Sequence, residues 1–342
     1  MAAWKKGAAI AGIAIAAVIV VGVPAMVGIR PFIGPKMRPL TDRRFEATPA
    51  RLERGKYLAT SGRTPCMICH SPIDVKPDGG IMIPAGLEFT GRSFAEEEIP
   101  FLTAPNLTPD KETGTGDWTD DQIARAVREG ISHDGRTLFP VMPYQHFKDM
   151  SDEDLASIIV FLRSLKPVRH ELPKTLVPFP VSRFINSVPE PVTAPVTPDL
   201  STPEKRGEYI VNMAACTDCH TPRDNDGNSR PDMPFAGGTL LPFTGRKTIY
   251  SANITPAVNG IPYYNEELFL ETMHTGKVRS RRLDDLMPTG FFGKMTDQDL
   301  KDVFAYLKTL RPIDHYVDNT LPPTKCAKCG FVHGGGERNK KS

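Results

Sequence analysis

The sequence is short of net charge and of isolated cysteines. Its 42 lysines and arginines against 40 aspartates and glutamates leave a formal net charge of +2, which is too small for the basic footprint of a nucleic-acid-binding protein. The six cysteines occur only as three C-x-x-C pairs, so the scattered single cysteines of a disulfide framework are missing. We therefore expect no nucleic-acid partner and no disulfide-stapled scaffold. The 342 residues are enough for two ordinary domains.

An internal repeat organises the chain. The segment C-M-I-C-H at 66–70 recurs as C-T-D-C-H at 216–220. Further matches pair 54–57 with 206–209, 89–92 with 243–246, 106–109 with 253–256 and 142–143 with 287–288. The repeat predicts two tandem copies of one domain, joined by a linker and followed by a tail. The expected boundaries are 49–168 and 203–313 for the domains, 169–202 for the linker and 314–342 for the tail.

Helix signals outnumber strand signals in both copies. Ser151 and Thr296 are predicted N-caps, each preceded by a methionine that can form a hydrophobic staple, and Thr119 is a third predicted N-cap. Helices are also expected over 49–61 and 203–214, directly before the two C-x-x-C-H segments. No stretch shows sustained period-two alternation, so the fold class is predicted to be mainly α.

The segments outside the two copies give different signals. The linker is rich in proline, which fixes φ and removes a hydrogen-bond donor, so we expect it to be extended and free of helix. The end of the tail, 334–342, is polar and basic and is expected to be disordered.

The C-x-x-C-H segments indicate covalent attachment of c-type haem. Two thiols one helical turn apart can reach both vinyl groups of one porphyrin, and the adjacent histidine is then the proximal ligand of the iron. An isolated C-x-x-C could instead be a redox dithiol or half of a zinc site, but here a histidine follows in both repeats. We expect two covalently bound haem c groups per chain. The predicted thioether and proximal residues are Cys66, Cys69, His70, Cys216, Cys219 and His220.

Each copy resembles a class I cytochrome c domain, with an N-terminal helix, C-x-x-C-H, a long loop, a Met-Pro element and a C-terminal helix. The sequence is similar to the haem domains in the cytochrome subunits of membrane-bound alcohol and gluconate dehydrogenases. The likeness rests on 106–108, 116–118, Tyr144 and 151–155, and it is stronger in the first copy than in the second. Those subunits carry three haems, whereas this chain has two C-x-x-C-H segments, an apolar N-terminus and an extra cysteine pair. The resemblance implies two tandem class I cytochrome c domains.

The sixth iron ligand is the next question. The family places it on a methionine before the last helix, which here means Met142 and Met287. The other methionines and histidines considered are two predicted staple residues, three histidines that do not recur and two that recur just past the last helix: Met150, Met295, His133, His146, His274, His170 and His315. A histidine past a helix end more often caps carbonyls or packs a loop, so we predict His/Met ligation in both copies.

His/Met ligation has a functional consequence. It fills both axial positions of the iron, and the thioether raises the reduction potential relative to bis-histidine ligation. We therefore expect an electron carrier and not an enzyme, with redox proteins of a membrane respiratory chain as donor and acceptor and no small-molecule substrate. The alternative is a cytochrome subunit of a larger dehydrogenase or haem–copper oxidase. A dihaem peroxidase is disfavoured, because it needs an open or displaceable axial position.

Two further groups of residues have candidate roles. Arg92 and Arg246 belong to the repeated F-T-G-R and could pair with haem propionates, although a solvated turn arginine is the alternative. Cys326 and Cys329 lack a following histidine and are not a third haem site. They could form a short-range disulfide, join His333 in a metal knuckle that still needs a fourth ligand for zinc, or remain idle thiols.

The N-terminus carries the longest apolar run of the sequence. Residues 7–29 are uncharged and long enough to cross a hydrocarbon core of about 30 Å. A cleaved signal peptide would have an apolar region of only about 7–15 residues. We therefore expect residues 1–30 to form one retained transmembrane helix in a bacterial inner membrane, with the haem domains in the periplasm.

Overall fold

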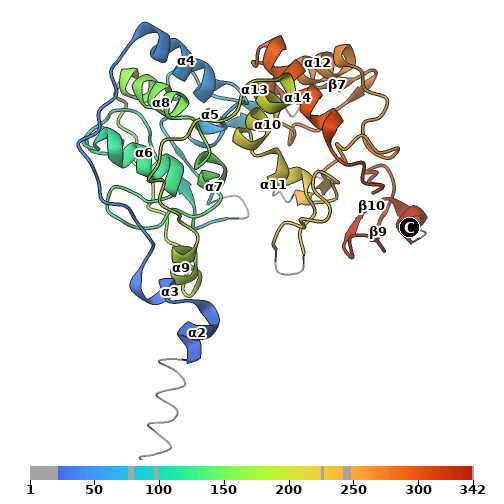
Figure 1. Ribbon diagram of the computed structural model, residues 1–342, viewed down its shortest axis with the longest axis horizontal. Helices are drawn as coiled ribbons and strands as arrows, with labels where there is room; N and C mark the ends of the chain where they lie inside the picture. Colours follow the sequence, from blue (N-terminus) through green and yellow to red (C-terminus); the bar gives the residue numbers. More distant parts are fainter. Residues whose placement is uncertain (1–21, 76–80, 96–98, 225–226, 242–247, 341–342) are drawn as a thin grey trace, which may run out of the picture. The chain divides into compact units, whose positions relative to one another are not determined.

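The computed structural model describes residues 22–75, 81–95, 99–224, 227–241 and 248–340, and helices dominate it (Figure 1). The helices are α2 Val23–Val27, α3 Arg30–Ile33, α4 Pro49–Thr60, α5 Cys66–Cys69, α6 Asp120–Glu129, α7 Tyr144–Phe147, α8 Asp152–Ser164, α9 Val181–Phe184, α10 Pro203–Met213, α11 Cys216–His220, α12 Glu266–Thr275, α13 Thr289–Phe292 and α14 Asp297–Thr309, with 3₁₀ helices η2 Ile185–Ser187 and η3 Gly336–Lys340. The mainly α prediction is confirmed.

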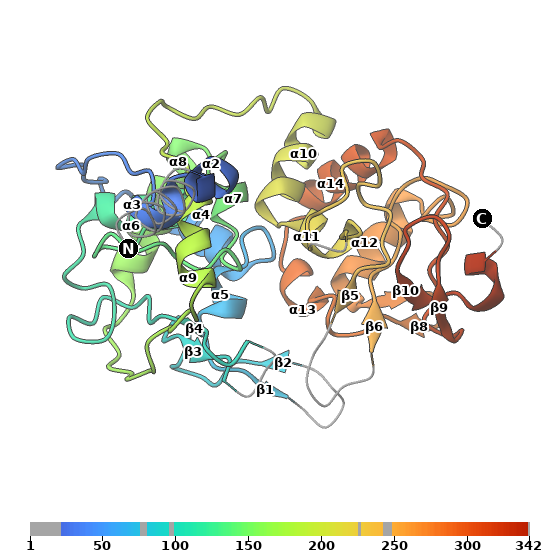
Figure 2. The same ribbon diagram turned by 90° about the horizontal axis from the view of Figure 1, so that it is seen from below.

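Strands are short and occur in antiparallel pairs. The pairs are β1 Asp74–Val75 with β2 Ile81–Met82, β3 Arg92–Ser93 with β4 Thr103–Ala104, β5 Leu240–Leu241 with β6 Ile249–Tyr250, β7 Lys277–Val278 with β8 Arg281–Arg282, and β9 Pro323–Lys325 with β10 Val332–Gly334. Figure 2 shows β9 and β10 together near the C-terminus. Two- and three-residue ladders cannot organise a core, so the helices do so.

The chain forms two compact units, which are described separately below. Unit 1 contains the described residues up to 44 together with 119–148 and 176–194. Unit 2 contains the described residues of 45–118, 149–175 and 195–340. The first repeat contributes to both units, and the whole second repeat lies in unit 2. The domain boundaries inferred from the repeat stay a prediction.

Each repeat packs its first helix against its last helix within unit 2, and a glycine makes this possible. Helix α4 packs on α8 and α10 packs on α14. A Cβ atom on Gly55 would lie 1.9 Å from the carbonyl oxygen of Ser157, and one on Gly207 would lie 1.9 Å from that of Asp302. The repeated R-G-x-Y motif therefore contains glycine because the two backbones approach too closely for any side chain.

The caps of the last helices appear as predicted. Ser151 Oγ accepts from the backbone N–H of Asp154, and Thr296 Oγ1 accepts from that of Asp299. In unit 1, Thr119 forms a complete capping box at the start of α6. These local hydrogen bonds satisfy N–H groups that lack partners in the first helical turn, which is why the sequence alone located these helix starts.

Two tyrosines of unit 2 connect the repeats reciprocally. Tyr57 of α4 donates to Asp299 Oδ2 at 2.5 Å and accepts from the backbone N–H of Thr296 at 3.1 Å. Tyr209 of α10 donates to Asp154 Oδ2 at 2.9 Å and accepts from the backbone N–H of Ser151 at 3.0 Å. Each tyrosine thus completes the N-terminal cap of the other repeat's last helix. The tyrosine of the R-G-x-Y motif therefore makes a contact between the repeats.

The prediction of an N-terminal transmembrane helix is wrong for the described part of the chain. None of the described helices combines the length and apolar character that a bilayer crossing requires. Residues 7–21 of the expected span lie outside the described residues. From residue 22 onward the chain makes α2, turns at Gly28 with φ +80°, and continues as α3. The described end of the expected span is therefore interrupted at Gly28, because a glycine at positive φ ends a helix.

The segment after α3 is held on α6 by an ion-paired arginine within unit 1. Arg38 lies 2.7 Å from carboxylate oxygens of both Asp121 and Glu129, and all three side chains are nearly buried. Thr41 donates its backbone N–H to Asp121 at 2.7 Å. Arg38, one of several basic residues after the apolar run, is therefore a structural ion-pair partner.

Two expectations about the connecting segments are also corrected. The proline-rich linker was expected to contain no helix, but it contains α9 and η2. The end of the tail was expected to be disordered, but it forms η3, in which Asn339 is buried. Asn339 donates to the carbonyl oxygens of Thr324 and His333. The polar composition of this segment reflects hydrogen bonding within the fold.

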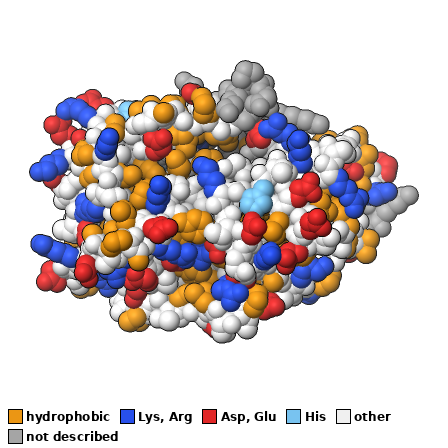
Figure 3. Space-filling view, turned by 90° about the horizontal axis from the view of Figure 1, so that it is seen from above, with side chains coloured by type: hydrophobic (Ala, Val, Ile, Leu, Met, Phe, Trp, Pro, Cys, Tyr) orange, Lys and Arg blue, Asp and Glu red, His pale blue; other side chains and the backbone are white. Residues whose placement is uncertain are grey.

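On the face shown in Figure 3, acidic and basic side chains are interspersed.

We predict that Tyr57→Phe and Tyr209→Phe each lower the free energy of unfolding by about 1–3 kcal/mol, because each removes a buried or partly buried hydrogen bond to a carboxylate. Urea-induced unfolding followed by circular dichroism measures the change. Tyr306→Phe is the matched control, since Tyr306 lies on the second repeat's own core. Equal stability of Tyr57→Phe, Tyr209→Phe and the control would contradict the role given to the reciprocal contacts.

Candidate haem-binding sites

Each C-x-x-C-H segment forms a single helical turn. Helix α5 carries Cys66 and Cys69, with His70 as its C-cap, and α11 carries Cys216, Cys219 and His220. Burial raises the pKa of the Cys66 thiol to about 11 and that of Cys216 to about 12. Redox-active C-x-x-C pairs instead have lowered thiol pKa values, so both pKa shifts run opposite to those of a redox dithiol.

The histidine of each segment is held in one orientation by a backbone carbonyl. His70 Nδ1 lies 2.8 Å from the carbonyl oxygen of Pro105, and His220 Nδ1 lies 2.8 Å from that of Ala252. A carbonyl only accepts, so Nδ1 carries the proton and Nε2 keeps its lone pair for a metal. The two carbonyls occupy equivalent places in the repeats, each directly before the asparagine of the repeated N-x-T motif.

The environment keeps these imidazoles neutral, which is the ligating form. Burial lowers the pKa of His70 to about 4; the hydrogen bond to Pro105 opposes this shift and the positive charge of Arg92 adds to it. Burial also lowers the pKa of His220, against the hydrogen bond to Ala252.

Asn106 and Asn253 fix the loops that carry the two carbonyls. Asn106 Oδ1 accepts from the backbone N–H and the hydroxyl of Thr108, and its amide donates to Val168 O at 2.8 Å. In the second repeat, Asn253 bonds Thr255 in the same way and donates to Ile313 O at 2.8 Å. The repeated N-x-T motif therefore ties the histidine-orienting loop to the chain just past the last helix.

Each repeat also has a strained turn beside this loop, and the position of the turn in the second repeat differs from the one that the sequence match predicted. Phe89 and Phe235 both have positive φ, at 63° and 61°. The N–H of Gly91 donates to His70 O at 2.8 Å, and that of Gly237 donates to His220 O at 2.7 Å. The structural equivalent of 89–91 is therefore 235–237, and the sequence match of 89–92 with 243–246 is wrong. The shared F-T-G-R letters were misleading because the equivalent turn reads F-A-G-G.

The two arginines predicted to pair with haem propionates are Arg92, which the structure describes, and Arg246, which it does not. The charge of Arg92 acts on His70, and its guanidinium lies 4.2 Å from the ring centroid of Phe94. This placement beside the proximal histidine supports the prediction, which stays untested. Arg246 lies outside the described residues, and the structural equivalent of Arg92 is Gly238.

Both Met-Pro elements have the same local structure. In unit 1, Met142 accepts through its carbonyl from Tyr144 N at 2.8 Å, and α7 follows. In unit 2, Met287 accepts from Thr289 N at 2.7 Å, and α13 follows. Met287 and Cys216 pack against one hydrophobic cluster built from α10, α12 and α14. Both methionines remain the predicted sixth ligands.

The rival ligands have other roles. Met150 and Met295 are 1% and 4% exposed and belong to the core, as their staple positions predicted. His274 contacts the carbonyl of Gly293 through Nδ1 and the carboxylate of Asp297 through Nε2, so both of its nitrogens are engaged. The other histidines lie at a surface turn, on α7 and beside loop carbonyls: His133, His146, His170 and His315.

The third cysteine pair belongs to a cluster of four side chains, three of which the sequence suggested as metal ligands. Cys326, Cys329 and His333 lie together, as the metal-knuckle alternative required. The fourth member is His315, whose recurrence in the sequence was noted but whose proximity to the tail was not predicted. Its position eleven residues before Cys326 gave no spacing signal of the kind that marks a metal ligand.

Comparison with known proteins identifies the class. The cytochrome c family model matches residues 204–311, which are the second repeat. The match supports a cytochrome c domain in this repeat, and such a domain implies a covalently bound haem c. The residues fit that group, because two protonated thiols and a neutral imidazole with an available Nε2 are present on one turn.

The relatives include cytochrome subunits of dehydrogenases and a dihaem cytochrome. The chain is 33% identical to the cytochrome c subunit of a quinone alcohol dehydrogenase from Gluconobacter oxydans (strain 621H), over 78% of this chain and 56% of the relative. It is 33% identical to the gluconate 2-dehydrogenase cytochrome c subunit of Pantoea cypripedii, over 78% and 60%. A dihaem c-type cytochrome from Cereibacter sphaeroides is 27% identical, over 79% and 89%.

The resemblance to cytochrome subunits that the sequence suggested is confirmed, and membrane anchoring is not. The chain spans only 56% and 60% of the length of the two dehydrogenase subunits. The likeness therefore concerns the cytochrome part that this chain shares with these longer proteins.

We predict that Gly91→Ala destabilises the protein by about 1–3 kcal/mol more than Gly86→Ala does, and that it weakens haem retention in the first repeat. Both glycines have φ +83°, so the left-handed strain is the same. A Cβ on Gly91 would lie 2.6 Å from Ala104 O, whereas nothing lies within 4 Å at Gly86. Urea unfolding and haem quantification provide the measurements. Equal losses for both variants would show that the tight turn does not govern the site.

Proposed function

We propose that this chain transfers electrons as a dihaem cytochrome c, with one haem c in each repeat. The observation that supports this most directly is the duplicated histidine geometry. His70 and His220 each follow two thiols on a helical turn and each donate Nδ1–H to a loop carbonyl at 2.8 Å. When bound, haem c supplies a one-electron iron couple.

The predicted axial methionines make the chain a carrier and not a catalyst. Met142 and Met287 stand at equivalent turns, and a thioether in the sixth position fills the site that a substrate would need. The protein residues then hold each histidine in one tautomer and keep it neutral. Rigidly held ligands limit reorganisation when an electron arrives or leaves, which suits electron transfer.

The proposed electron donor follows from the relatives. Three of them are named as cytochrome subunits of alcohol, gluconate and fructose dehydrogenases. We propose that this chain likewise accepts electrons from a dehydrogenase subunit and passes them to a second redox protein. Covalent haem attachment, which we associate with export, supports placing both haem domains in the periplasm.

We predict that the wild-type chain contains two acid-stable haems and that Met287→His lowers the potential of one of them. The shift should be on the order of 0.1 V or more, because axial ligands span about 0.8 V of potential and imidazole favours ferric iron. Pyridine haemochrome analysis counts the haems, and spectroelectrochemical titration measures both potentials. Met142→His should shift the other haem.

Met295→Leu is the matched control for these substitutions. It replaces a buried core methionine at nearly constant volume, so both potentials should stay in place. A single haem per chain would contradict the dihaem proposal. Unchanged potentials in Met287→His would contradict methionine ligation, and ready carbon monoxide binding by the wild type would indicate an open site.

We also predict that the full-length chain co-purifies with a dehydrogenase subunit in mild detergent and that the substrate of that enzyme reduces its haems. A chain with His70→Ala and His220→Ala should keep the partner and lose the rapid reduction. Mass spectrometry identifies the partner, and stopped-flow absorbance follows the reduction. Isolation of a fully reducible chain with no dehydrogenase would contradict the partner but not the electron-transfer role.

A further inference from the structure

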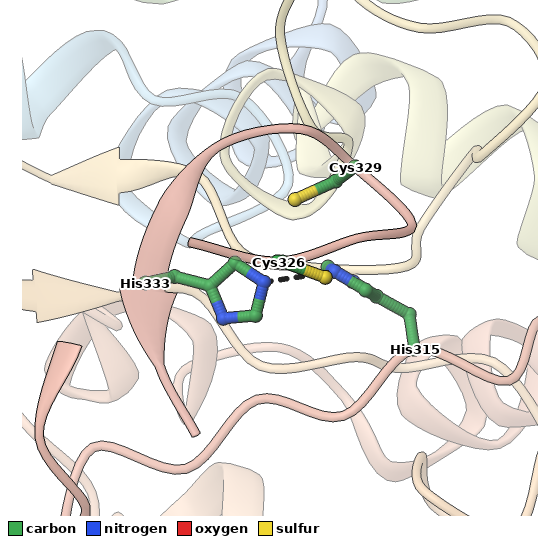
Figure 4. A group of neighbouring side chains, drawn as sticks. All are labelled: His315, Cys326, Cys329 and His333. Atoms are coloured by element: carbon green, nitrogen blue, oxygen red, sulfur yellow. Dashed lines mark hydrogen bonds between the residues drawn. The ribbon is translucent and has the colours of Figure 1, made fainter. Parts of the chain in front are cut away.

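Four side chains with metal-binding atoms meet in unit 2, away from the haem-attachment turns. His315, Cys326, Cys329 and His333 are all buried, and one ligand atom from each lies within 4.8 Å of the other three. Figure 4 shows the side chains pointing toward one another. His315 follows the last helix, and the other three belong to the β9–β10 hairpin and its turn. Two separate segments of chain thus converge on one point.

The hairpin turn is built to present its two sulfur atoms. Gly330 donates its N–H to Cys326 O at 2.9 Å and has φ +81°, and Cys326 donates its own N–H to Phe331 O at 2.7 Å. The backbone N–H of Phe331 also points at Cys329 Sγ, at 3.5 Å. An N–H directed at sulfur favours the thiolate, which is the metal-binding form.

The two imidazoles face each other in a way that calls for a cation. His315 Nδ1 lies 2.8 Å from Ala236 O, and His333 Nδ1 lies 2.9 Å from Gly334 O. Both carbonyls are acceptors, so each Nδ1 carries the proton and each Nε2 carries a lone pair. Yet the two Nε2 atoms lie only 3.0 Å apart. Two buried lone pairs at this distance repel, and a metal ion between them would remove the repulsion.

One neighbouring amide, that of Asn339, is compatible with this tautomer of His333. Asn339 Nδ2 lies 3.5 Å from His333 Nδ1, but it donates to the carbonyl oxygen of His333 at the shorter distance of 2.9 Å. The nearest partner of Nδ1 is therefore the carbonyl of Gly334. Asn339 thus fixes the strand that carries His333 and leaves its Nε2 directed at His315.

The first repeat provides an internal comparison. His170 is the equivalent of His315 and contacts Thr90 O through Nδ1 at 2.9 Å, as His315 contacts Ala236 O. The residue three positions after the turn phenylalanine differs, because the first repeat has an arginine there and the second has Gly238. A Cβ on Gly238 would lie 2.8 Å from His315 Cε1. The second repeat combines this glycine with the cysteine tail, and so it assembles four ligands.

We propose that His315, Cys326, Cys329 and His333 form a structural zinc site. Tetrahedral zinc with Zn–N of about 2.0 Å and Zn–S of about 2.3 Å places its ligand atoms roughly 3.3–3.8 Å apart, which fits a single ion within this cluster. Two thiolates balance the charge of Zn²⁺, so the buried site is neutral overall. The four ligands leave no open position, as in structural zinc sites.

Zinc suits this position better than a redox metal. A tetrahedral S₂N₂ set selects zinc or iron, and a two-iron cluster would spread its ligands over two ions, whereas all four ligand atoms here surround one point. Zinc has no redox chemistry of its own, so it would not compete with haem for electrons. The site is independent of the proposed electron transfer and would exist whether or not that proposal holds.

The zinc site would connect the tail to a haem-binding loop. His315 bonds Ala236 O, and the N–H of the next residue, Gly237, bonds His220 O at 2.7 Å. The metal would therefore fasten 315–333 beside the turn that contacts the proximal histidine of the second repeat. Metal binding and folding of the tail are then one process.

The test is zinc analysis of the full-length, haem-loaded chain. We expect about one zinc per chain by mass spectrometry of the metals, and a zinc K-edge spectrum with two sulfur and two nitrogen neighbours at about 2.3 and 2.0 Å. This spectrum needs no variant and is unaffected by haem iron. A folded, haem-loaded wild type without zinc, or with iron at the cluster, would overturn the proposal, as would a Cys326–Cys329 peptide lighter by two hydrogens.

Variants test the ligand assignment. Cys326→Ser with Cys329→Ser should remove the zinc while the haem spectrum remains, and His315→Ala should weaken zinc binding at least about tenfold in competition with a chelator. His170→Ala is the matched control and should keep the zinc fully. Zinc retained by the double cysteine variant, or lost equally from His170→Ala and His315→Ala, would overturn the assignment.

Discussion

The hydrogen bond from each predicted proximal histidine to a loop carbonyl is the interaction on which both candidate sites depend. It sets the tautomer of His70 and His220 and so leaves Nε2 with the lone pair that a metal would need. A carbonyl can do this only if its loop is fixed, and the N-x-T motifs fix it through Asn106 and Asn253. The tight F-x-G turn then closes on the same histidine through its own N–H. In each repeat, two loop segments therefore form hydrogen bonds to the same histidine.

The features predicted from sequence were those with a local cause. The N-caps at Ser151 and Thr296 bond the helix that they begin, so a short stretch of sequence contains the whole interaction. The staple methionines are buried for the same reason. The C-x-x-C-H segments were recognisable because their spacing matches one helical turn, and the cytochrome c family model matches the second repeat, which contains one of them.

The features that were missed depend on backbone conformation or on distant segments. The turns at 89–91 and 235–237 are equivalent because a phenylalanine at positive φ begins each of them. The sequence does not reveal this equivalence, because the threonine of the first turn is an alanine in the second. The expected transmembrane helix is not found in the described part of the chain, where no helix is both long and apolar enough to cross a bilayer. His315 joined the tail cysteines through tertiary contact alone, and no spacing rule covers such a contact.

The reciprocal tyrosine contacts relate the two repeats as the subunits of a symmetric dimer are related. Tyr57 reaches Asp299, and the equivalent Tyr209 reaches Asp154, so the same surface of each repeat meets its own counterpart. This is the rule of an isologous interface, in which residue i contacts j and j contacts i, as in a two-fold homodimer. The tandem chain thus holds, inside one polypeptide, a contact of the kind that joins two copies in a two-fold homodimer. The two halves are nevertheless different, because only the second is followed by the cysteine pair of the tail.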